Sequence, residues 1–227
     1  MPTSTFFNLP DEKRQLLLDI AIDEFGAHPY AVASISKIVE RARIAKGSIY
    51  QYFADKEAFY LYLVGYAVER QMTLLGELVS GGSNGDLFDR LRWQMDATLH
   101  VGLAAPALVR LLRRALQTDP PLRHAVDQIV GGASDSHFRL LIEDAIARGE
   151  LDPALDVDLA AYVIRQVMSE LAGFLVRRLG LSLDAVADDL SLLDSAEVGA
   201  VYDRLIAILR HGLGRAVNVA PANGGLR

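Results

Sequence analysis

The chain has 227 residues, of which 51% are hydrophobic and 23% are charged, and it contains no cysteine. This composition is typical of a globular protein with one or two domains, and it excludes disulfides, cysteine-ligated metal sites and cysteine nucleophiles. The formal net charge of −6 at pH 7 argues against a non-specific nucleic-acid coat, which needs a strongly basic chain.

The N-terminal residues, Met-Pro-Thr-Ser-Thr-Phe-Phe-Asn, lack the basic and apolar regions of a signal peptide. The longest stretch without an acidic residue, lysine or arginine runs from residue 97 to 109 and has 13 residues. A membrane-spanning helix needs about 20 apolar residues. We therefore expect a cytoplasmic protein with no membrane partner.

The spacing of apolar residues predicts three helices in the N-terminal quarter. The first covers about residues 9–26, and Ser34 can cap a short second helix because its hydroxyl accepts a backbone N–H. A very short connection, Arg43-Ile44, separates the second helix from a third over about residues 45–52.

The third helix has two different faces. Ile49 and Phe53 fall four apart on a side suited to packing. The other side carries Lys46, Gly47, Tyr50 and Gln51. Residues 31–54 have a net charge of +3, whereas residues 11–24 have a net charge of −3. This separation of sign within one small unit indicates a directed surface.

Asp55 can cap a fourth helix that runs to about residue 79, and a Gly- and Ser-rich loop follows over residues 80–85. Beyond this loop the pattern is helical throughout, without the two-residue alternation of a strand, so the fold class is all-α. Helices are expected at about residues 86–104, 106–117, 121–148, 156–180 and 196–213. We expect Gly131-Gly132 to kink or split the third of these.

A helix, a short turn and a small second helix form the helix-turn-helix device, whose second helix enters the major groove of DNA. The segment reads Ala42-Arg43-Ile44-Ala45-Lys46-Gly47-Ser48-Ile49-Tyr50-Gln51-Tyr52-Phe53-Ala54-Asp55-Lys56-Glu57. It resembles the TetR family signature, Ala-Gly-Val-Ser-Lys-Gly-Thr-Leu-Tyr-x-Tyr-Phe-x-x-Lys-Glu, and the close resemblance covers residues 10–65. It implies a three-helix DNA-binding domain over residues 1–54 and a helical effector-binding and dimerisation domain over residues 55–216. The composition of residues 217–227, with Pro221, Gly224 and Gly225, predicts a flexible tail.

Three residues depart from the family pattern. Arg43 stands where the turn glycine is usual, Ala45 replaces a capping serine or threonine, and Pro29 replaces a glycine after the first helix. Loss of a hydroxyl N-cap costs about 0.5–2 kcal/mol, so we expect Ile49 and Phe53 to hold the third helix by packing. Arg43 is expected to add a phosphate contact.

Lys56 is an informative candidate because a cation in the first turn of a helix opposes the helix dipole by about 0.3–1 kcal/mol. A DNA phosphate would explain its presence, although solvated surface charge is the common role of a single lysine. The candidate DNA-binding residues are Ser34, Ser36, Lys37, Arg43, Lys46, Gly47, Ser48, Tyr50, Gln51, Tyr52 and Lys56.

The C-terminal region carries no nucleotide, nucleophile or metal-ligand fingerprint, so no catalytic residue, metal or cofactor is expected. Its apolar stripes are typical of a plain core, but the family resemblance implies an effector pocket among the middle helices. Candidate pocket residues are Trp93, Leu99, His100, Leu103, Leu112, Phe138, Ile142, Ile164 and Met168. Such a pocket suits an apolar or amphipathic effector, with His100 and Arg165 as polar handles.

The last two long helices have more apolar surface than one edge helix needs, which predicts a homodimer through a four-helix bundle. The candidate interface residues are Leu159, Tyr162, Leu171, Leu175, Val201, Leu205, Ile208 and Leu209. The leading hypothesis is a homodimeric repressor that a small-molecule effector releases from a double-stranded DNA operator, with residues 55–79 as the coupling helix. An all-α enzyme and a DNA-binding or interaction module without effector are the alternatives.

Overall fold

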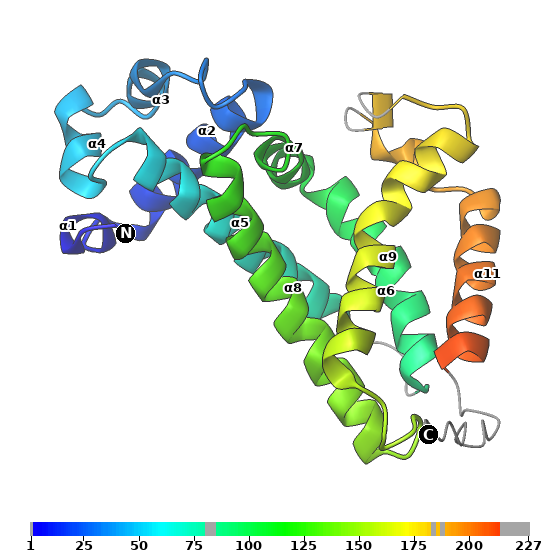
Figure 1. The fold of residues 1–227 in the computed structure, drawn as a ribbon. Helices are drawn as coiled ribbons and strands as arrows, with labels where there is room; N and C mark the ends of the chain where they lie inside the picture. The colour runs from blue at the N-terminus through cyan, green and yellow to red at the C-terminus, as the bar shows by residue number, and fades with distance from the viewer. Residues whose placement is uncertain (1, 80–84, 183–184, 187–188, 214–227) are drawn as a thin grey trace, which may run out of the picture.

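The structure, a computed structural model, describes residues 2–79, 85–182, 185–186 and 189–213, and these ranges contain helices and no strand (Figure 1). The elements are α1 (Ser4–Phe7), α2 (Asp11–Ala27), α3 (Ile35–Arg41), α4 (Lys46–Tyr52), α5 (Lys56–Val79), α6 (Leu87–Ala104), α7 (Pro106–Ala115), α8 (Leu122–Ala147), α9 (Val157–Arg178), the 3-10 helix η1 (Leu190–Leu193) and α11 (Ala196–Leu213). The all-α prediction is confirmed, and the long helices begin and end within a few residues of their predicted bounds.

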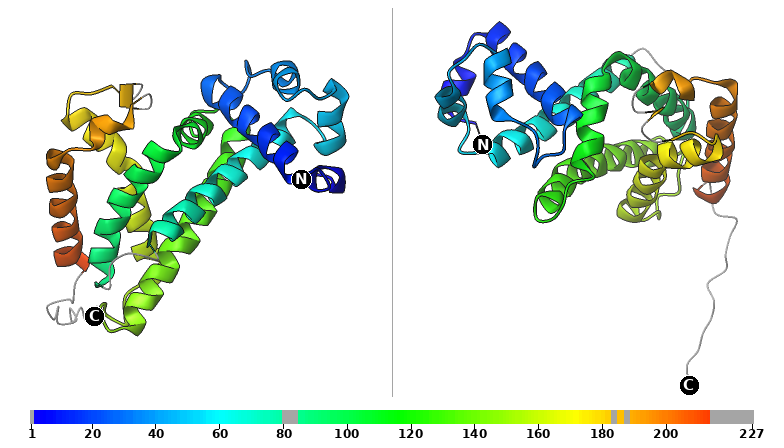
Figure 2. Two further views of the ribbon diagram at one scale, coloured as in Figure 1. Left: turned by 180° about the vertical axis from the view of Figure 1, so that it is seen from behind. Right: turned by 90° about the horizontal axis from the view of Figure 1, so that it is seen from above.

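Helices α1 to α4 form one end of the molecule, and α6, α9 and α11 form the other, with α5 and α8 running between them (Figures 1 and 2). The N-terminal core forms because α2 buries one face, including Leu18, Ala21 and Phe25, against α3 and α5. Phe59 and Leu63 from the first turns of α5 belong to the same cluster. The first half of α5 is therefore part of the N-terminal core.

Helix α7 is a second link between the two ends, because it packs along α2. The helices approach closely at Gly26, where an added Cβ would lie 3.4 Å from the backbone nitrogen of Leu111. The Arg114 side chain also donates to the carbonyl oxygen of Gly26 at 3.0 Å. The hydrophobic core consequently continues across residue 54, the predicted domain boundary.

Two short elements were not predicted, α1 and η1. A helix of four residues has no periodicity to detect, yet Phe6 of α1 is fully buried. The sequence predicts a kink or a split at Gly131-Gly132. The split is wrong, because α8 is one helix from Leu122 to Ala147. Helix α8 packs along α5 and α9, and these contacts stabilise the helix as a whole against the low helix propensity of the two glycines. Residues 80–84 of the loop predicted at 80–85, and the predicted tail, lie outside the described residues.

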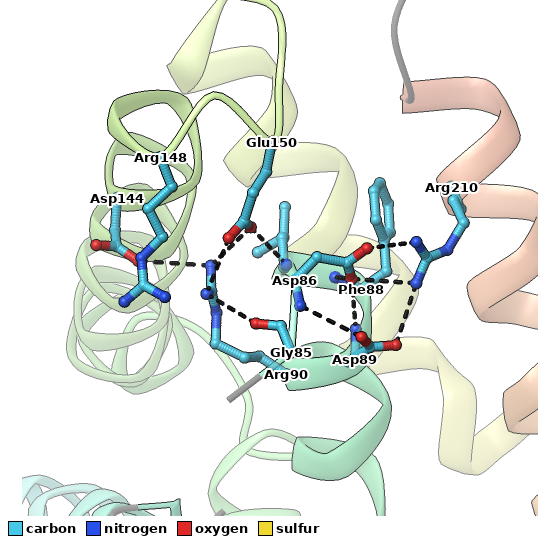
Figure 3. Close-up of polar contacts among 10 residues, drawn as sticks. Gly85, Asp86, Phe88, Asp89, Arg90, Asp144, Arg148, Glu150 and Arg210 are labelled. Atoms are coloured by element: carbon cyan, nitrogen blue, oxygen red, sulfur yellow. Dashed lines mark hydrogen bonds and ion pairs between the residues drawn. The ribbon is translucent and has the colours of Figure 1, made fainter. Parts of the chain in front are cut away.

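An ion-pair network joins α6 to α8 and α11 at the end remote from α3 and α4 (Figure 3). Asp86 caps α6, and the Arg210 guanidinium of α11 donates to the carboxylates of Asp86 and Asp89 at 3.1 Å each. Burial opposes ionisation of Asp86, but the backbone N–H of Asp89 and the Arg210 guanidinium donate to its carboxylate and hold its pKa below the usual value. Arg90 of α6 pairs with Glu150 beyond α8 at 3.2 Å. This end of α6 is thereby fixed to both neighbours.

Candidate nucleic-acid interface

Helix α3 is held on α2 by polar and apolar contacts. Ser34 caps it as predicted, because the Ser34 hydroxyl accepts the backbone N–H of Lys37 at 3.4 Å. The backbone N–H of Ser34 in turn donates to the Glu24 carboxylate at 3.0 Å, and Glu24 is only 6% exposed. Ile38 is fully buried beneath the helix. These contacts set the position of α3, with Ser36 and Lys37 exposed on its outer side.

The turn between α3 and α4 depends on Arg43, whose backbone φ is +53°. A residue with a Cβ has a penalty of about 1–2 kcal/mol in this left-handed region, which explains why a glycine is usual here. The backbone N–H of Arg43 and of Ile44 donate to the carbonyls of Glu40 and Val39, at 3.1 and 3.0 Å. The turn therefore keeps its hydrogen bonds, and the long Arg43 side chain is exposed.

Helix α4 has seven residues and no side-chain cap at Ala45, as expected from the sequence. It is held by Ile49 and Phe53, which are fully buried, so the expectation that packing holds this helix is confirmed. Tyr50 is 51% exposed on the outer side. An added Cβ at Gly47 would have no neighbour within 4 Å, so the protein itself does not need a glycine there. The open space permits close approach of a ligand to the backbone.

The outer surface of α3, the turn and α4 combines cations with groups that form hydrogen bonds. Within the described part of the chain, Lys37, Arg43 and Lys46 are exposed and form no ion pair with another described residue. Arg41, by contrast, pairs with Asp23 at 3.2 Å. Gln51 is exposed and Ser48 is half-buried on the same helix. Such a surface suits phosphates and base edges in a DNA groove.

Tyr52 and Lys56 lie differently from the other candidates. Tyr52 is buried, at 8% exposed, and its ring packs 6.0 Å from that of Phe6, so the prediction that it faces DNA is corrected. The Lys56 ammonium lies 4.8 Å from the ring centroid of Tyr30 and 6.0 Å from that of Phe25. Burial lowers the pKa of Lys56, against the opposite effect of Glu24. Lys56 thus has partners inside the protein, and a phosphate is not needed to explain it.

Two family descriptions together match most of the chain. "Bacterial regulatory proteins, tetR family" matches residues 17–63, and "Tetracyclin repressor-like, C-terminal domain" matches residues 85–214. The chain belongs to the TetR family. The fold and family of this TetR-family chain are accordingly those of DNA-binding transcriptional regulators and not those of enzymes.

Several proteins similar to this TetR-family chain have been described. The structure of a TetR family transcriptional regulator from Chloroflexus aurantiacus J-10-FL is 39% identical, covers 95% of this chain and 100% of its own, and has a TM-score of 0.66. The fatty acid metabolism regulator protein of Bacillus subtilis is 27% identical over 162 residues, 70% of this chain and 80% of that protein. The B. subtilis regulator FadR, solved with stearoyl-CoA, shares the fold at 18% identity over 86% of this chain and 96% of its own, with a TM-score of 0.62. Another curated relative is matched over only 25% of its length.

Helices α5, α6, α7, α9 and α11, together with η1, line a cavity of about 230 Å³ in this TetR-family structure. Of the predicted pocket residues, Leu99 and Met168 line the cavity. Phe138, Ile142 and Ile164 are buried in the neighbouring core. Trp93 packs near Leu75, Leu103 is half-buried on α6, and Leu112 packs against the N-terminal core.

The polar groups of the cavity differ from the predicted handles. His100 is exposed, with its ring Nδ1 2.7 Å from the carbonyl oxygen of Asp96. Arg165 lies 2.5 Å from Asp135 and is absent from the lining. The polar lining residues are Gln71, Gln94, Thr98 and Tyr202. They come from three helices, so no sequence spacing could have grouped them.

A second hollow is an apolar groove of about 320 Å³ between α9 and α11. The predicted interface residues Leu171, Val201, Leu205 and Ile208 line it, together with Phe174. Leu159, Tyr162 and Ile208 are 60%, 50% and 68% exposed, whereas Leu175, Val201 and Leu209 are buried within the chain. By length and composition α9 passes the test for a membrane-spanning helix, as a core helix of a globular protein also can, and α6 with α7 passes the same test but is bent by 103°. Here α9 packs along α8.

Proposed function

We propose that this TetR-family chain is a homodimeric repressor that binds a near-palindromic DNA operator through α3, the turn at Arg43 and α4. The main support for this proposal is the outer face of these elements. There Lys37, Arg43 and Lys46 have no ion-pair partner among the described residues, and Tyr50 is exposed. Lysine and arginine bind phosphates, while Tyr50 and Gln51 reach base edges. The two copies of α4 in a dimer would lie about 34–36 Å apart, one turn of DNA.

The experiment is a selection of bound duplexes from a random library, followed by affinity measurements at several salt concentrations. We expect a two-fold related consensus and a linear fall of log K with log salt, because the cations displace counterions from phosphates. Lys46→Ala should weaken binding to the selected and a scrambled duplex alike, whereas Gln51→Ala should change the preferred sequence. A library recovered without sequence preference contradicts the proposal.

The proposed dimer contact is the groove between α9 and α11 with the exposed apolar residues beside it. A second copy would cover Leu159, Tyr162 and Ile208, which are large, exposed apolar side chains on the two helices that form the groove. Light scattering should therefore return twice the chain mass of 24.8 kDa. Ile208→Glu should produce monomers, since it places a charge in the contact. Glu143→Gln, at an exposed position of α8, is the control. A wild-type monomer at micromolar concentration excludes this contact.

The proposed effector is amphipathic, with an acyl chain as its apolar part. The cavity lined by Leu99 and Met168 supports this, as does the curated relative that is a fatty acid metabolism regulator. At about 230 Å³ the cavity is smaller than the roughly 300–1,000 Å³ of ordinary ligand pockets, so a ligand must separate the helices that line it. An effector would therefore favour a second conformation, which is the condition for allosteric release.

The coupling to DNA would run through α5 and α7. Gln71 of α5 and Val109 of α7 line the cavity, and both helices pack against the N-terminal helices. Stearoyl-CoA is a suitable probe, with free coenzyme A as control, in thermal shift and operator-binding assays. The acyl compound should raise the melting temperature and lower operator affinity, and operator should weaken its binding by the same factor. Equal affinity of stearoyl-CoA for the free and the operator-bound protein refutes this mechanism. A chain that shows no response to any effector supports the alternative of a DNA-binding module without effector.

A further inference from the structure

Helix α1 and the residues before it lie outside the segment that matches the family, which begins at residue 17. In the structure this short segment contacts α4, the proposed recognition helix (Figure 1). The backbone N–H of Thr3 donates to the carbonyl oxygen of Tyr52 at 2.9 Å. The Thr3 hydroxyl donates to the carbonyl oxygen of Gln51 at 2.7 Å. The two contacts join residues that are 49 and 48 positions apart along the chain.

These bonds satisfy carbonyl groups that α4 cannot satisfy itself. The last four carbonyls of a helix have no partner within it, and here the N–H of Phe53 occupies only that of Ile49. Helix α4 also has seven residues, no side-chain N-cap and Gly47 in its first turn. A helix this short is not stable alone and depends on tertiary contacts. Thr3 supplies such contacts at the C-terminal end of the helix.

Phe6 adds an apolar contact at the same end. Its side chain is fully buried, with ring centroids 5.0 Å from Phe53 and 5.4 Å from Tyr62 of α5. The segment is fixed from its other side as well, because the Arg14 guanidinium of α2 donates to the carbonyl oxygen of Phe7 at 2.9 Å. Helix α1 therefore connects α2, α4 and α5 around the C-terminal end of α4.

We propose that Thr3 and Phe6 are positioning residues that set the orientation of α4 on DNA, and so determine operator affinity and sequence preference; this rests on the proposed DNA-binding function. Thr3 binds the backbone of Gln51, whose exposed side chain is a candidate for reading bases. A small rotation of α4 would move the Tyr50 and Gln51 side chains away from base edges. Contacts to phosphates tolerate such a shift better than the directional bonds to bases.

The test uses the full chain with a C-terminal affinity tag, the duplex selected by the wild-type protein, and a scrambled duplex. Thr3→Val removes the hydroxyl with little change of shape, and Thr3→Ser retains it. We expect Thr3→Val to lower operator affinity about three- to tenfold. Affinity for the scrambled duplex and the salt slope should stay unchanged, the melting temperature should fall by no more than about 2–4 °C, the equivalent of one hydrogen bond, and Thr3→Ser should behave as wild type.

A second pair of variants tests the packing contact. Phe6→Leu should reduce the ratio of operator to scrambled affinity, whereas Phe7→Leu is the matched control because Phe7 is 54% exposed. Wild-type operator affinity in Thr3→Val overturns the proposal, as does an equal loss on both duplexes accompanied by a lower melting temperature. If the wild-type protein shows no sequence preference in the selection, the proposed function itself is overturned. That result needs no variant, so it is distinguishable from failure of the Thr3 and Phe6 proposal.

Discussion

Gly47→Ala separates the stability of α4 from its function. Alanine is favoured over glycine within helices by about 0.5–1 kcal/mol. The new Cβ would meet no atom within 4 Å, so nothing in the protein opposes this gain. For a chain of this size 1 kcal/mol corresponds to roughly 2–4 °C. We therefore expect thermal denaturation to show a melting temperature raised by about 1–4 °C.

DNA binding should change in the opposite direction. If the backbone of α4 approaches DNA at Gly47, a methyl group there removes a hydrogen bond to a charged phosphate, which contributes about 1.5–3 kcal/mol. Operator affinity should fall about 10- to 100-fold. Gly131→Ala is the matched control, because its added Cβ also meets nothing within 4 Å and it lies in α8, whereas α4 packs on α1 and α3. Its stability should rise without loss of affinity. A stabilised Gly47→Ala protein that binds operator as wild type does refutes the close approach.

Arg43→Gly should raise the free energy of unfolding by about 0.5–1 kcal/mol, because the relief of the positive φ outweighs the backbone entropy that glycine adds to the unfolded chain. The same variant should bind any duplex more weakly, with a salt slope lower by about 1, and an unchanged slope excludes a phosphate contact. Arg90→Met should lower the free energy of unfolding by about 2 kcal/mol, since it leaves Glu150 without its ion pair in a half-buried site. Arg123→Met, at an exposed ion pair, should lower it by less than about 1 kcal/mol, and equal losses refute the claim that burial strengthens the Arg90 pair. Burial lowers the pKa of His137 below 6.5, so the unfolded chain binds its proton first and stability declines as pH falls from 6.5 through the lowered pKa. Denaturation at several pH values should show a shallower decline for His137→Gln, and an identical decline contradicts this assignment.

The DNA-facing surface follows from the sequence to a large extent because a helix face is a local property. Residues three and four apart lie on the same side of a helix, so spacing alone assigns Ile49 and Phe53 to the core, and Lys46 and Tyr50 to the surface. The inclusion of Tyr52 among the DNA-binding candidates did not follow from this spacing. Tyr52 lies three residues after Ile49, on the packing side, and its ring lies 6.0 Å from that of Phe6, 46 positions earlier in the chain.

Sequence alone determined the all-α class, the family and the order of the helices, because helix periodicity and a contiguous signature are both written along the chain. Only the tertiary structure decided which residues that are distant along the chain come into contact. It places the Lys56 ammonium over the rings of Tyr30 and Phe25, Gln94 and Tyr202 in the lining of one cavity, and Thr3 at the C-terminal end of α4. Such contacts join residues distant in sequence, and their geometry is set by how whole helices pack, which no local spacing encodes.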